Sequence, residues 1–523
     1  MASAPEVASV QDVLSVPIAA SVTNGASESN GTSESNNTSE SNGTLESNGH
    51  PVTNGESVSN GTTVLNGTSA ISSVPNGISA IASVPDDPVT YPVPNGTSTA
   101  SPGPEKLSLA IIGGGIGGIA LALGLLEHPR IDFQIYEAAP IWVQIGAGLG
   151  LGPNAQAALE LLGPETTAAF RNNVTGNLWE THQKTFLNFF SGQGPNAGQL
   201  IHTQKCSTGL QSCHRAKFVD DLVKRVPADR VHMGKRLVSI QDKSGVDEPV
   251  LLTFADGSTA TADAVIGADG IHSYTREFMM GKDEAKPTFS GSVAYRGLVP
   301  MDLAVEKLGA EVAQNATMFC GPGRALLCSP IEHGKVVNIA AVNPENLKWE
   351  HEKWSMPCQW EELDRLFEGW GPQARGMVEL LKGPELARWA IFDNALAPTY
   401  TKGRVALLGD AAHATTPWQG QGAGQALEDA LTLKHLLTDA STSPNRTQIP
   451  NVFYAYDQVR RPRTQRVVKT SREAGLLFGM RTPGIEGDLK KMSQELGRRM
   501  HWVWHRDLEA QNRAAGELFR ESL

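Results

Sequence analysis

The sequence predicts an α/β fold in which a Rossmann-like nucleotide-binding domain is interleaved with a second domain built on a β-sheet. An apolar run enters a glycine-rich turn at residues 107–118. Two further apolar runs, at 264–266 and 405–408, end in Gly-Ala-Asp-Gly and Gly-Asp. Between these segments lie longer apolar runs that are typical of strands, at 292–299, 324–329 and 335–342. Alternation of the two kinds of segment along one chain indicates two interleaved domains.

The first 104 residues differ in composition from the rest of the chain. They contain nine acidic residues but no Lys, Arg, Phe or Trp, and residues 27–49 repeat a SESNGT-like hexapeptide. Such a tract buries too little apolar area to offset the entropy of ordering, so we expect a disordered tail. The remaining 419 residues carry 46 acidic and 44 basic side chains. Because this near-neutral body has no Lys/Arg-rich run to neutralise phosphates, we do not expect nucleic acid as a partner.

The cysteines and one uncharged run bear on the location of the protein. The five cysteines are odd in number and show no CxxC spacing, which predicts free thiols in a reducing compartment, and we expect a cytoplasmic protein. Twenty uncharged residues between Lys106 and Glu127 are long enough for a membrane span. Five glycines within 113–118 would each weaken a helix by about 1 kcal/mol, so we predict a βα unit and no membrane partner.

The first glycine-rich turn has the spacing of a dinucleotide-binding site. Residues 107–112 form a predicted buried strand, and Gly113, Gly115 and Gly118 complete a GxGxxG pattern. The first glycine permits the turn, the second allows close approach of a pyrophosphate, and the third allows the following helix to pack on the sheet. These residues are therefore candidate cofactor-binding positions.

The elements after this turn support the same site. A helix predicted at 116–127 directs its positive N-terminus at the phosphates. A second strand at 133–136 ends in Glu137, where an acceptor for a ribose hydroxyl is expected. This unit alone leaves open whether the nucleotide is NAD(P) or FAD.

A later segment, RVALLGDAAHATTPWQGQGAGQALED at 404–429, favours flavin. A short strand ends in Asp410, which is placed to accept hydrogen bonds from a polyol, and a glycine-rich loop leads into a helix at 422–437. The segment resembles the second FAD motif of the single-component flavoprotein aromatic hydroxylases, which include the 4-hydroxybenzoate and salicylate hydroxylases. The resemblance implies that Asp410 contacts the ribityl chain of FAD. It also implies that the loop beside the isoalloxazine is formed by Pro417, Gly420, Gly422, Ala423 and Gly424.

Other segments resemble the same family. TADAVIGADGIHSYTR at 261–276 resembles its DG motif, which implies roles for Asp269 and Gly270 in FAD pyrophosphate and NAD(P)H binding. CHRAKFVDDL resembles the helix whose arginine, here Arg215, reaches FAD. GAGLGLGPN resembles the loop after the second strand and places Gly150 among the cofactor-binding residues. With YxxxxxRRPR near residue 460, the match spans about 107–475.

The resemblance implies a reaction and its partners. NAD(P)H reduces FAD, and one oxygen atom of dioxygen passes from a flavin hydroperoxide to a small phenolic or hydroxybenzoate-type substrate. Ring hydroxylation, decarboxylative hydroxylation, dearomatising hydroxylation of a polyketide phenol, and a flavin-dependent oxidase or dehydrogenase all remain open. We expect no metal, because the histidines are scattered without HxxxH or HExxH spacing. We expect a monomer or a homodimer.

We assign domains from these motifs. The expected order is a tail at 1–104, a Rossmann-like FAD-binding domain at 105–180, 211–284 and 396–475, a β-sheet-based substrate domain at 181–210 and 285–395, and a helical C-terminal segment at 476–523.

Arg296 is the candidate catalytic residue. It lies in Tyr295-Arg296-Gly297, a motif that recurs in salicylate hydroxylase relatives, and its guanidinium could pair with a phenolate or carboxylate. A structural pair within the sheet is the alternative. The chain departs from the family at Ser329, where relatives often carry an aromatic residue, and at Trp418, where they often carry His or Tyr. Trp418 could instead form an apolar wall or simply pack in the core.

Overall fold

The computed structural model describes residues 106–142, 148–243, 248–344, 348–441 and 443–523. The predicted tail at 1–104 and the first two residues of the predicted loop at 146–154 lie outside the described residues.

A six-stranded sheet carries the three glycine motifs. Its strand order is β18-β19-β11-β1-β2-β7, and the strands are parallel except for the edge strand β18. Strands β1, β11 and β19 are buried along almost their whole length, as expected for central strands of a covered parallel sheet. The strands are β1 (Leu107–Ile112), β2 (Ile131–Tyr136), β7 (Val231–His232), β11 (Ala264–Gly267), β18 (Thr401–Lys402) and β19 (Val405–Leu407).

The order of the strands explains why the motifs meet. Strands β19, β11 and β1 are neighbours in that order and run parallel. The carboxyl ends of parallel neighbours share one edge of a sheet, so the glycine turns that follow these strands converge there. Segments that are up to about 300 residues apart in sequence are thereby joined at one edge.

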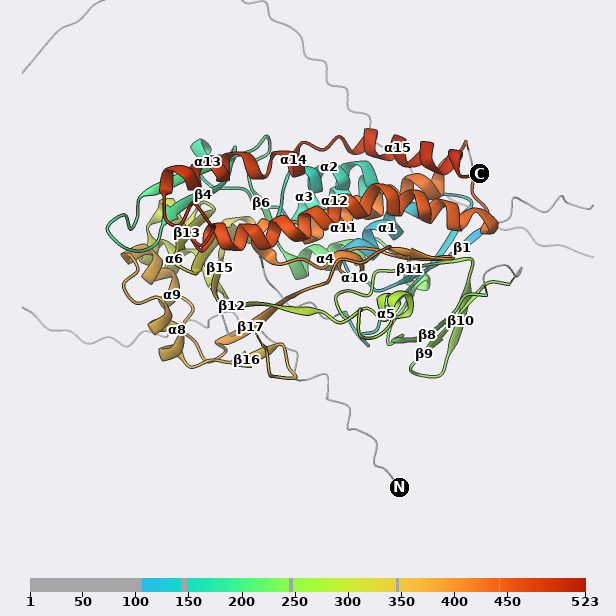
Figure 1. Cartoon of the computed structure of the whole chain (residues 1–523), viewed down its shortest axis with the longest axis horizontal. Helices are drawn as coiled ribbons and strands as arrows, with labels where there is room; N and C mark the ends of the chain where they lie inside the picture. The colour runs from blue at the N-terminus through green and yellow to red at the C-terminus, as the bar shows by residue number, and fades with distance from the viewer. Residues whose placement is uncertain (1–105, 143–147, 244–247, 345–347, 442) are drawn as a thin grey trace, which may run out of the picture. The chain divides into compact units, whose positions relative to one another are not determined.

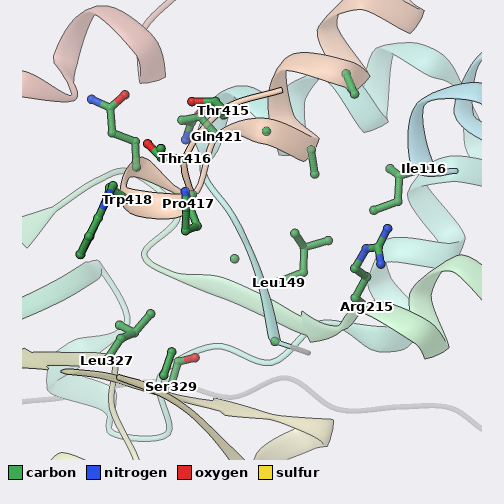
Figure 2. A pocket seen from close by; sticks show the side chains of 18 of the residues that line it. Ile116, Leu149, Arg215, Leu327, Ser329, Thr415, Thr416, Pro417, Trp418 and Gln421 are labelled. Atoms are coloured by element: carbon green, nitrogen blue, oxygen red, sulfur yellow. The ribbon is translucent and has the colours of Figure 1, made fainter. Parts of the chain in front are cut away.

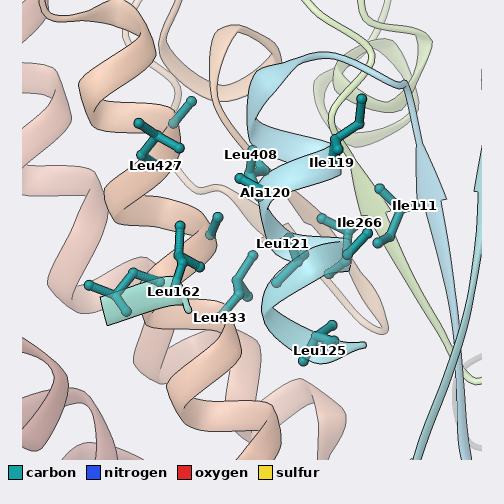
Figure 3. Packing of buried hydrophobic residues seen from close by; sticks show 14 of the residues in the cluster. Ile111, Ile119, Ala120, Leu121, Leu125, Leu162, Ile266, Leu408, Leu427 and Leu433 are labelled. Carbon is teal, nitrogen blue, oxygen red and sulfur yellow. The ribbon is translucent and has the colours of Figure 1, made fainter. Parts of the chain in front are cut away.

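Apolar helices pack against this sheet. Figure 3 shows Leu121 and Leu125 of helix α1 beside Leu162 of α2 and Leu433 of α11, all of which are buried. Helix α1 is buried on nearly all of its faces. Burial inside the protein therefore explains why this run is apolar and uncharged, and no membrane span is needed to explain it. Within the described ranges, no helix has the length and apolarity needed to cross a bilayer. The helices of this layer are α1 (Ile116–Leu125), α2 (Pro153–Leu162), α3 (Pro164–Asn173), α4 (Arg215–Val223), α10 (Asp410–His413) and α11 (Gly422–Thr438).

The second sheet has eight strands in the order β16-β17-β12-β15-β14-β13-β4-β5. All neighbours are antiparallel except β13 and β4. The predicted runs at 292–299 and 324–329 lie within β12 and β14, and the run at 335–342 begins one residue before β15. The strands are β4 (Thr185–Ser191), β5 (Leu200–Lys205), β12 (Thr288–Pro300), β13 (Thr317–Gly321), β14 (Arg324–Ile331), β15 (Val336–Pro344), β16 (Ser355–Pro357) and β17 (Ala387–Asp393).

Side chains alternate between the two faces of this sheet. One set packs in a buried cluster with the helices α6 (Met301–Leu308), α7 (Ala310–Ala313), α8 (Trp360–Leu366) and α9 (Pro372–Glu379). Tyr295 belongs to that cluster, whereas Arg296 and Ala294 lie on the opposite face. A one-residue change of register would exchange the two sets, so the apolar pattern of β12 determines that Arg296 faces away from the helices.

Smaller elements complete the two sheets. Strands β8 (Leu237–Gln241), β9 (Val250–Phe254) and β10 (Thr259–Ala262) form an antiparallel sheet, and β3 (Gly148–Leu151) pairs with β6 (Gln211–His214). Helix α5 (Tyr274–Met280) follows the DG turn. The sequence therefore correctly predicts an α/β fold with a Rossmann-like sheet and a second β-sheet, and the structure adds that the second sheet is mostly antiparallel.

The C-terminal part of the chain is helical, as predicted. The long helix α12 (Ile449–Phe478) packs on α11, and α13 (Leu489–Arg499), α14 (His501–Trp504) and α15 (Leu508–Glu521) follow it. Helix α13 packs on β5 of the antiparallel sheet, whereas α15 packs on α11 and α12 (Figure 1). The C-terminal helices thus pack both on the antiparallel sheet and on helices beside the parallel sheet.

Candidate active site

A cavity of about 480 Å³ lies between the glycine turns and the antiparallel sheet. Figure 2 shows Trp418 and Pro417 on one side of it, Leu327 and Ser329 facing them from the sheet, and Arg215 further along. The walls therefore come from the glycine turns of the parallel sheet and from the antiparallel sheet.

Most of the predicted site residues line this cavity. They are Gly115, Gly118, Gly150, Arg215, Gly270, Arg296, Asp410, Pro417, Gly420, Gly422 and Ala423. Four predicted residues do not line it: Gly113, Glu137, Asp269 and Gly424.

Two of these four are glycines required by close packing. A Cβ on Gly113 would lie 2.3 Å from the carbonyl oxygen of Ala268, and the φ of Gly113 is +107°. A Cβ on Gly424 would lie 3.2 Å from the Cβ of Ala155 in α2. Both glycines shape the site by allowing neighbouring backbone segments to approach, as the GxGxxG reasoning expects for a turn.

The other two are carboxylates that hold turns. Glu137 accepts hydrogen bonds from the backbone N–H groups of Gly114, at 2.7 Å, and Ala139, at 2.8 Å. Asp269 accepts from the Ser273 hydroxyl at 2.5 Å and from the backbone N–H of Thr275 at 2.9 Å. Burial raises the pKa of Asp269, against the effect of these hydrogen bonds. Each carboxylate therefore orders a turn at the cavity edge.

Two helix N-termini lie at the cavity. Helices α1 and α11 begin after Gly115 and Gln421, and neither has a side-chain cap among the described residues. Both first turns lack acidic residues, so unpaired N–H groups and the helix dipole favour an anion. A Cβ on Gly115 would have no neighbour within 4 Å, which leaves room for a ligand to approach the backbone.

Unpaired polar groups lie beside these helix ends. The Thr415 hydroxyl and the Gln421 amide nitrogen are buried without a hydrogen-bond partner in the described ranges. Asp410 is exposed to the cavity at the start of α10. Buried polar groups without partners are rare in proteins, so these groups indicate a polar ligand. Donors at two helix ends and a carboxylate acceptor fit the phosphates and hydroxyl groups of FAD.

A cluster of buried ion pairs links α11 to α12. Arg460 donates to Glu428 at 2.6 Å and to Asp429 at 2.7 Å, and Arg463 donates to Glu428 at 2.7 and 2.8 Å. Burial would raise the pKa of Glu428, but Arg460 and Arg463 outweigh it and lower that pKa to about 2. All four side chains are at most 7% exposed. The charges are therefore paired in a region with little water.

The cluster is connected to the cavity loops. Asp429 accepts from the backbone N–H of Gly409 at 3.0 Å and contacts Nε2 of His413 at 2.6 Å. Asn154 donates to Glu428 at 2.8 Å and to Gln421 at 3.0 Å. Thus the carboxylates orient both the Gly-Asp turn and the start of α11. The sequence analysis identified the RRPR pattern but did not predict that its arginines hold the carboxylates that orient the cavity loops. The residues of this network are up to about 310 positions apart in the sequence.

Sequence reasoning also missed the C-terminal contribution to the cavity. Phe478, Arg499 and Met500 line it, although 476–523 is a separate segment in our prediction. Met492 and Leu496, four residues apart in an amphipathic helix, are buried against the β4–β5 region. That spacing indicates a packed helix face, but it does not say which surface the helix packs on.

Comparisons with known proteins agree with this geometry. Residues 106–471 match the family model described as FAD binding domain. The chain is 44% identical to 6-methylsalicylate 1-monooxygenase of Aspergillus terreus over 421 residues, which cover 80% of this chain and 93% of that protein. It is 36% identical to a salicylate hydroxylase of Pseudomonas putida, covering 77% of this chain and 93% of the relative.

A solved structure shows the same fold. A salicylate hydroxylase in complex with its substrate has a TM-score of 0.71 and 35% sequence identity, and the match covers 79% of this chain and 98% of that chain. The family-model match at residues 106–471 includes both sheets and the glycine turns. The chain therefore belongs to the FAD-binding monooxygenase family, among the relatives of the salicylate hydroxylases, and is an FAD-dependent monooxygenase.

Proposed function

We propose that this chain uses NAD(P)H and FAD to hydroxylate a phenolic or hydroxybenzoate-type aromatic substrate. Its similarity to a 6-methylsalicylate monooxygenase and to salicylate hydroxylases supports this substrate class. The cavity supports it as well, because apolar side chains and cationic groups line the same space.

The cavity residues have separate tasks in this proposal. The N-terminus of α1 and Arg215 would hold the phosphates, and Asp410 would hold the ribityl hydroxyls. The loop with Pro417 and Gly420 and the N-terminus of α11 would flank the ring. FAD, when bound, supplies the electron transfer from NAD(P)H and the transfer of one oxygen atom of dioxygen to the ring. Asp269 and Glu137 hold the turns that present these groups.

One observation carries the substrate assignment. Arg215 and Arg296 both line the cavity, and within the described part of the chain neither side chain has a hydrogen bond or an ion pair. Desolvation lowers the pKa of Arg296, and the positive charge of Arg215 lowers it further. Arg296 nevertheless keeps exposed surface at the cavity and Arg215 is partly exposed, so a ligand can reach both guanidinium groups. Their shared positive charge favours ligands that bring negative charge. We assign the FAD side to Arg215 and an ionised oxygen of the substrate to Arg296.

The rest of the cavity suits an aromatic ring. Trp418 packs edge-on to Phe478, with ring centroids 6.1 Å apart, and a Cβ on Gly475 would lie 2.5 Å from the Trp418 indole nitrogen. Trp418 is thus held rigidly, and Leu327 and Leu210 provide further apolar surface. An apolar wall excludes water from the reacting groups, which the oxygen transfer requires.

The holoenzyme tests the proposed function directly. We expect salicylate or 6-methylsalicylate to stimulate both NAD(P)H oxidation and oxygen uptake, with a product that carries one added oxygen atom by mass spectrometry. Carbon dioxide released per NAD(P)H consumed separates decarboxylative hydroxylation from ring hydroxylation, and loss of aromatic absorbance identifies dearomatisation. Turnover that needs no NAD(P)H would indicate an oxidase instead. No stimulation by any phenol of a panel, with FAD bound, would contradict the proposal.

Replacing Arg296 with glutamine tests the substrate contact. We expect the KM for the aromatic substrate to rise by about 10- to 100-fold, because a hydrogen bond to a charged group is lost, while the FAD content stays constant. Arg324→Gln is the matched control: Arg324 lies in the same sheet and donates to Asn343 at 2.7 Å, outside the cavity lining. Unchanged kinetics in R296Q would assign Arg296 a structural role.

A further inference from the structure

Gln421 presents an unpaired hydrogen-bond donor to the cavity. It is the residue before α11, it lines the cavity, and it is only 1% exposed. Its amide nitrogen is buried and has no hydrogen-bond partner among the described residues. In Figure 2 it lies on the same side of the cavity as Thr415 and Pro417. Because a buried donor without a partner is costly, this amide indicates an acceptor on a bound ligand.

A chain of hydrogen bonds determines which end of this amide faces the cavity. Asn154 donates to Glu428 at 2.8 Å and to the side-chain oxygen of Gln421 at 3.0 Å. Glu428 is ionised, since Arg460 and Arg463 hold its pKa at about 2, and an ionised carboxylate can only accept. Asn154 must therefore offer its amide nitrogen, and this nitrogen serves both contacts. Gln421 is left to accept with its oxygen and to direct its own N–H groups into the cavity.

The amide contact between Asn154 and Gln421 is tightly enclosed. Asn154 is 1% exposed, and Glu428 is fully buried. A Cβ on Gly424 would lie 3.3 Å from the side-chain oxygen of Gln421 and 3.4 Å from the amide nitrogen of Asn154, so the first turn of α11 packs directly on their contact. Asn154 itself does not line the cavity. It can therefore act on a ligand only through Gln421.

The position of Gln421 indicates which part of FAD it meets. In the proposed arrangement, the N-terminus of α11 flanks the ring system of the cofactor. The acceptors of that ring system include two carbonyl oxygens and N1 on its pyrimidine edge, whereas its dimethylbenzene edge has none. The first turn of α11 carries the positive end of the helix dipole and no acidic residue, so it favours an edge that can become negative. The amide donor and the helix therefore act on the same edge.

We propose that Gln421, oriented by Asn154 and Glu428, donates to the pyrimidine edge of FAD and thereby raises the reduction potential of the cofactor. A hydride from NAD(P)H brings two electrons and one proton, so the ring system gains one negative charge, which the pyrimidine edge carries. A donor at that edge binds the reduced form more tightly than the oxidised form, because hydrogen bonds to charged groups are the stronger ones. The inference depends on bound FAD and not on the identity of the aromatic substrate.

The reduction potential of the bound flavin tests the contact. Gln421→Met keeps an unbranched side chain of similar length and removes the donor. We expect the equilibrium constant for reduction to fall by about 10- to 100-fold, the cost of losing a hydrogen bond to a charged group. For two electrons this is a shift of about −30 to −60 mV. Equilibrium reduction of the holoenzyme together with a reference dye, followed by absorbance, measures it.

Asn154→Leu tests the positioning role, because Asn154 lies outside the cavity lining. We expect a shift in the same direction, and the double variant Q421M/N154L should not fall below Q421M, since one residue acts through the other. Gln156→Met is the matched control. Gln156 lies on the same helix, donates to the carbonyl oxygen of Leu151 and to the hydroxyl of Thr208, both at 2.9 Å, and does not line the cavity. Its replacement should leave the potential unchanged.

FAD content and thermal unfolding verify that each variant is intact. For a variant that holds FAD weakly, the ratio of its dissociation constants for reduced and oxidised FAD gives the same quantity, because a thermodynamic cycle links that ratio to the potential. Wild-type potential in Q421M, or an equal loss of affinity for both forms of FAD, would overturn the contact. A potential that falls in Q421M but not in N154L would overturn the positioning role.

These outcomes are separate from those of the proposed function. The potentials are measured without an aromatic substrate, so an enzyme that no phenol stimulates could still show the expected shifts. Conversely, an enzyme that hydroxylates salicylate while Q421M keeps the wild-type potential would contradict this inference alone.

Discussion

Replacing Arg460 with methionine is expected to lower the free energy of unfolding by about 3–5 kcal/mol. Arg460 is fully buried and pairs with both Glu428 and Asp429, so its removal takes one cationic partner from each of two buried carboxylates. Urea unfolding followed by circular dichroism measures the change. We also expect loss of FAD, because Asp429 orients the Gly409 turn.

An exposed residue of the same helix provides the comparison. Lys469 lies on the exposed side of α12, and Lys469→Met should change stability by less than about 0.5 kcal/mol. Equal effects of the two substitutions would contradict the role given to the ion cluster.

Acid unfolding provides a second readout of the cluster. The pKa of Glu428 is lowered from 4.5 to about 2, so its contribution to stability is present above pH 4.5 and is lost as the pH falls toward 2. Without Arg460 that pKa rises, and acid unfolding should begin at a higher pH than in the wild type.

Replacing Gly115 with valine is expected to abolish FAD retention while the protein stays folded. A side chain at this position meets nothing within 4 Å, and the φ of −75° suits valine. Apoprotein stability should therefore fall by less than about 1 kcal/mol, the cost of a poor N-cap residue. The valine side chain occupies the space through which a phosphate would approach α1, and we expect FAD affinity to fall by roughly 10- to 100-fold or more.

Gly118 separates the loss of cofactor from the loss of fold. A Cβ on Gly118 would lie 2.3 Å from the carbonyl oxygen of Gly113, so Gly118→Val should destabilise the apoprotein by about 1–3 kcal/mol or more. Flavin absorbance after desalting and thermal unfolding of the apoprotein distinguish the two variants. A G115V protein that retains FAD at the wild-type level would show that the cofactor does not approach this turn.

The sequence alone was sufficient for the fold class and for much of the cavity lining. Short-range patterns carried this information: an apolar strand, glycines at set spacings and a helix start are all contained within about 30 residues. Gly115, Gly270 and Asp410 each follow a strand by a few residues, and these strands are neighbours in a parallel sheet, so their convergence follows from the fold class. Such patterns reflect local backbone geometry, which nearby residues determine.

Only the tertiary structure decided which distant side chains complete the cavity. Arg499 and Gln419 are 80 residues apart and meet through Thr470, and Glu428 is paired by arginines that lie more than 30 residues later. The tertiary structure also showed that the two aspartates have different positions: Asp269 holds a turn, whereas Asp410 faces the cavity. An amphipathic helix shows in its sequence that one face is buried, but the surface that covers this face is selected by the packing of the whole chain. For that reason the sequence predicted a helical C-terminal segment, and the fold made it a wall of the active site.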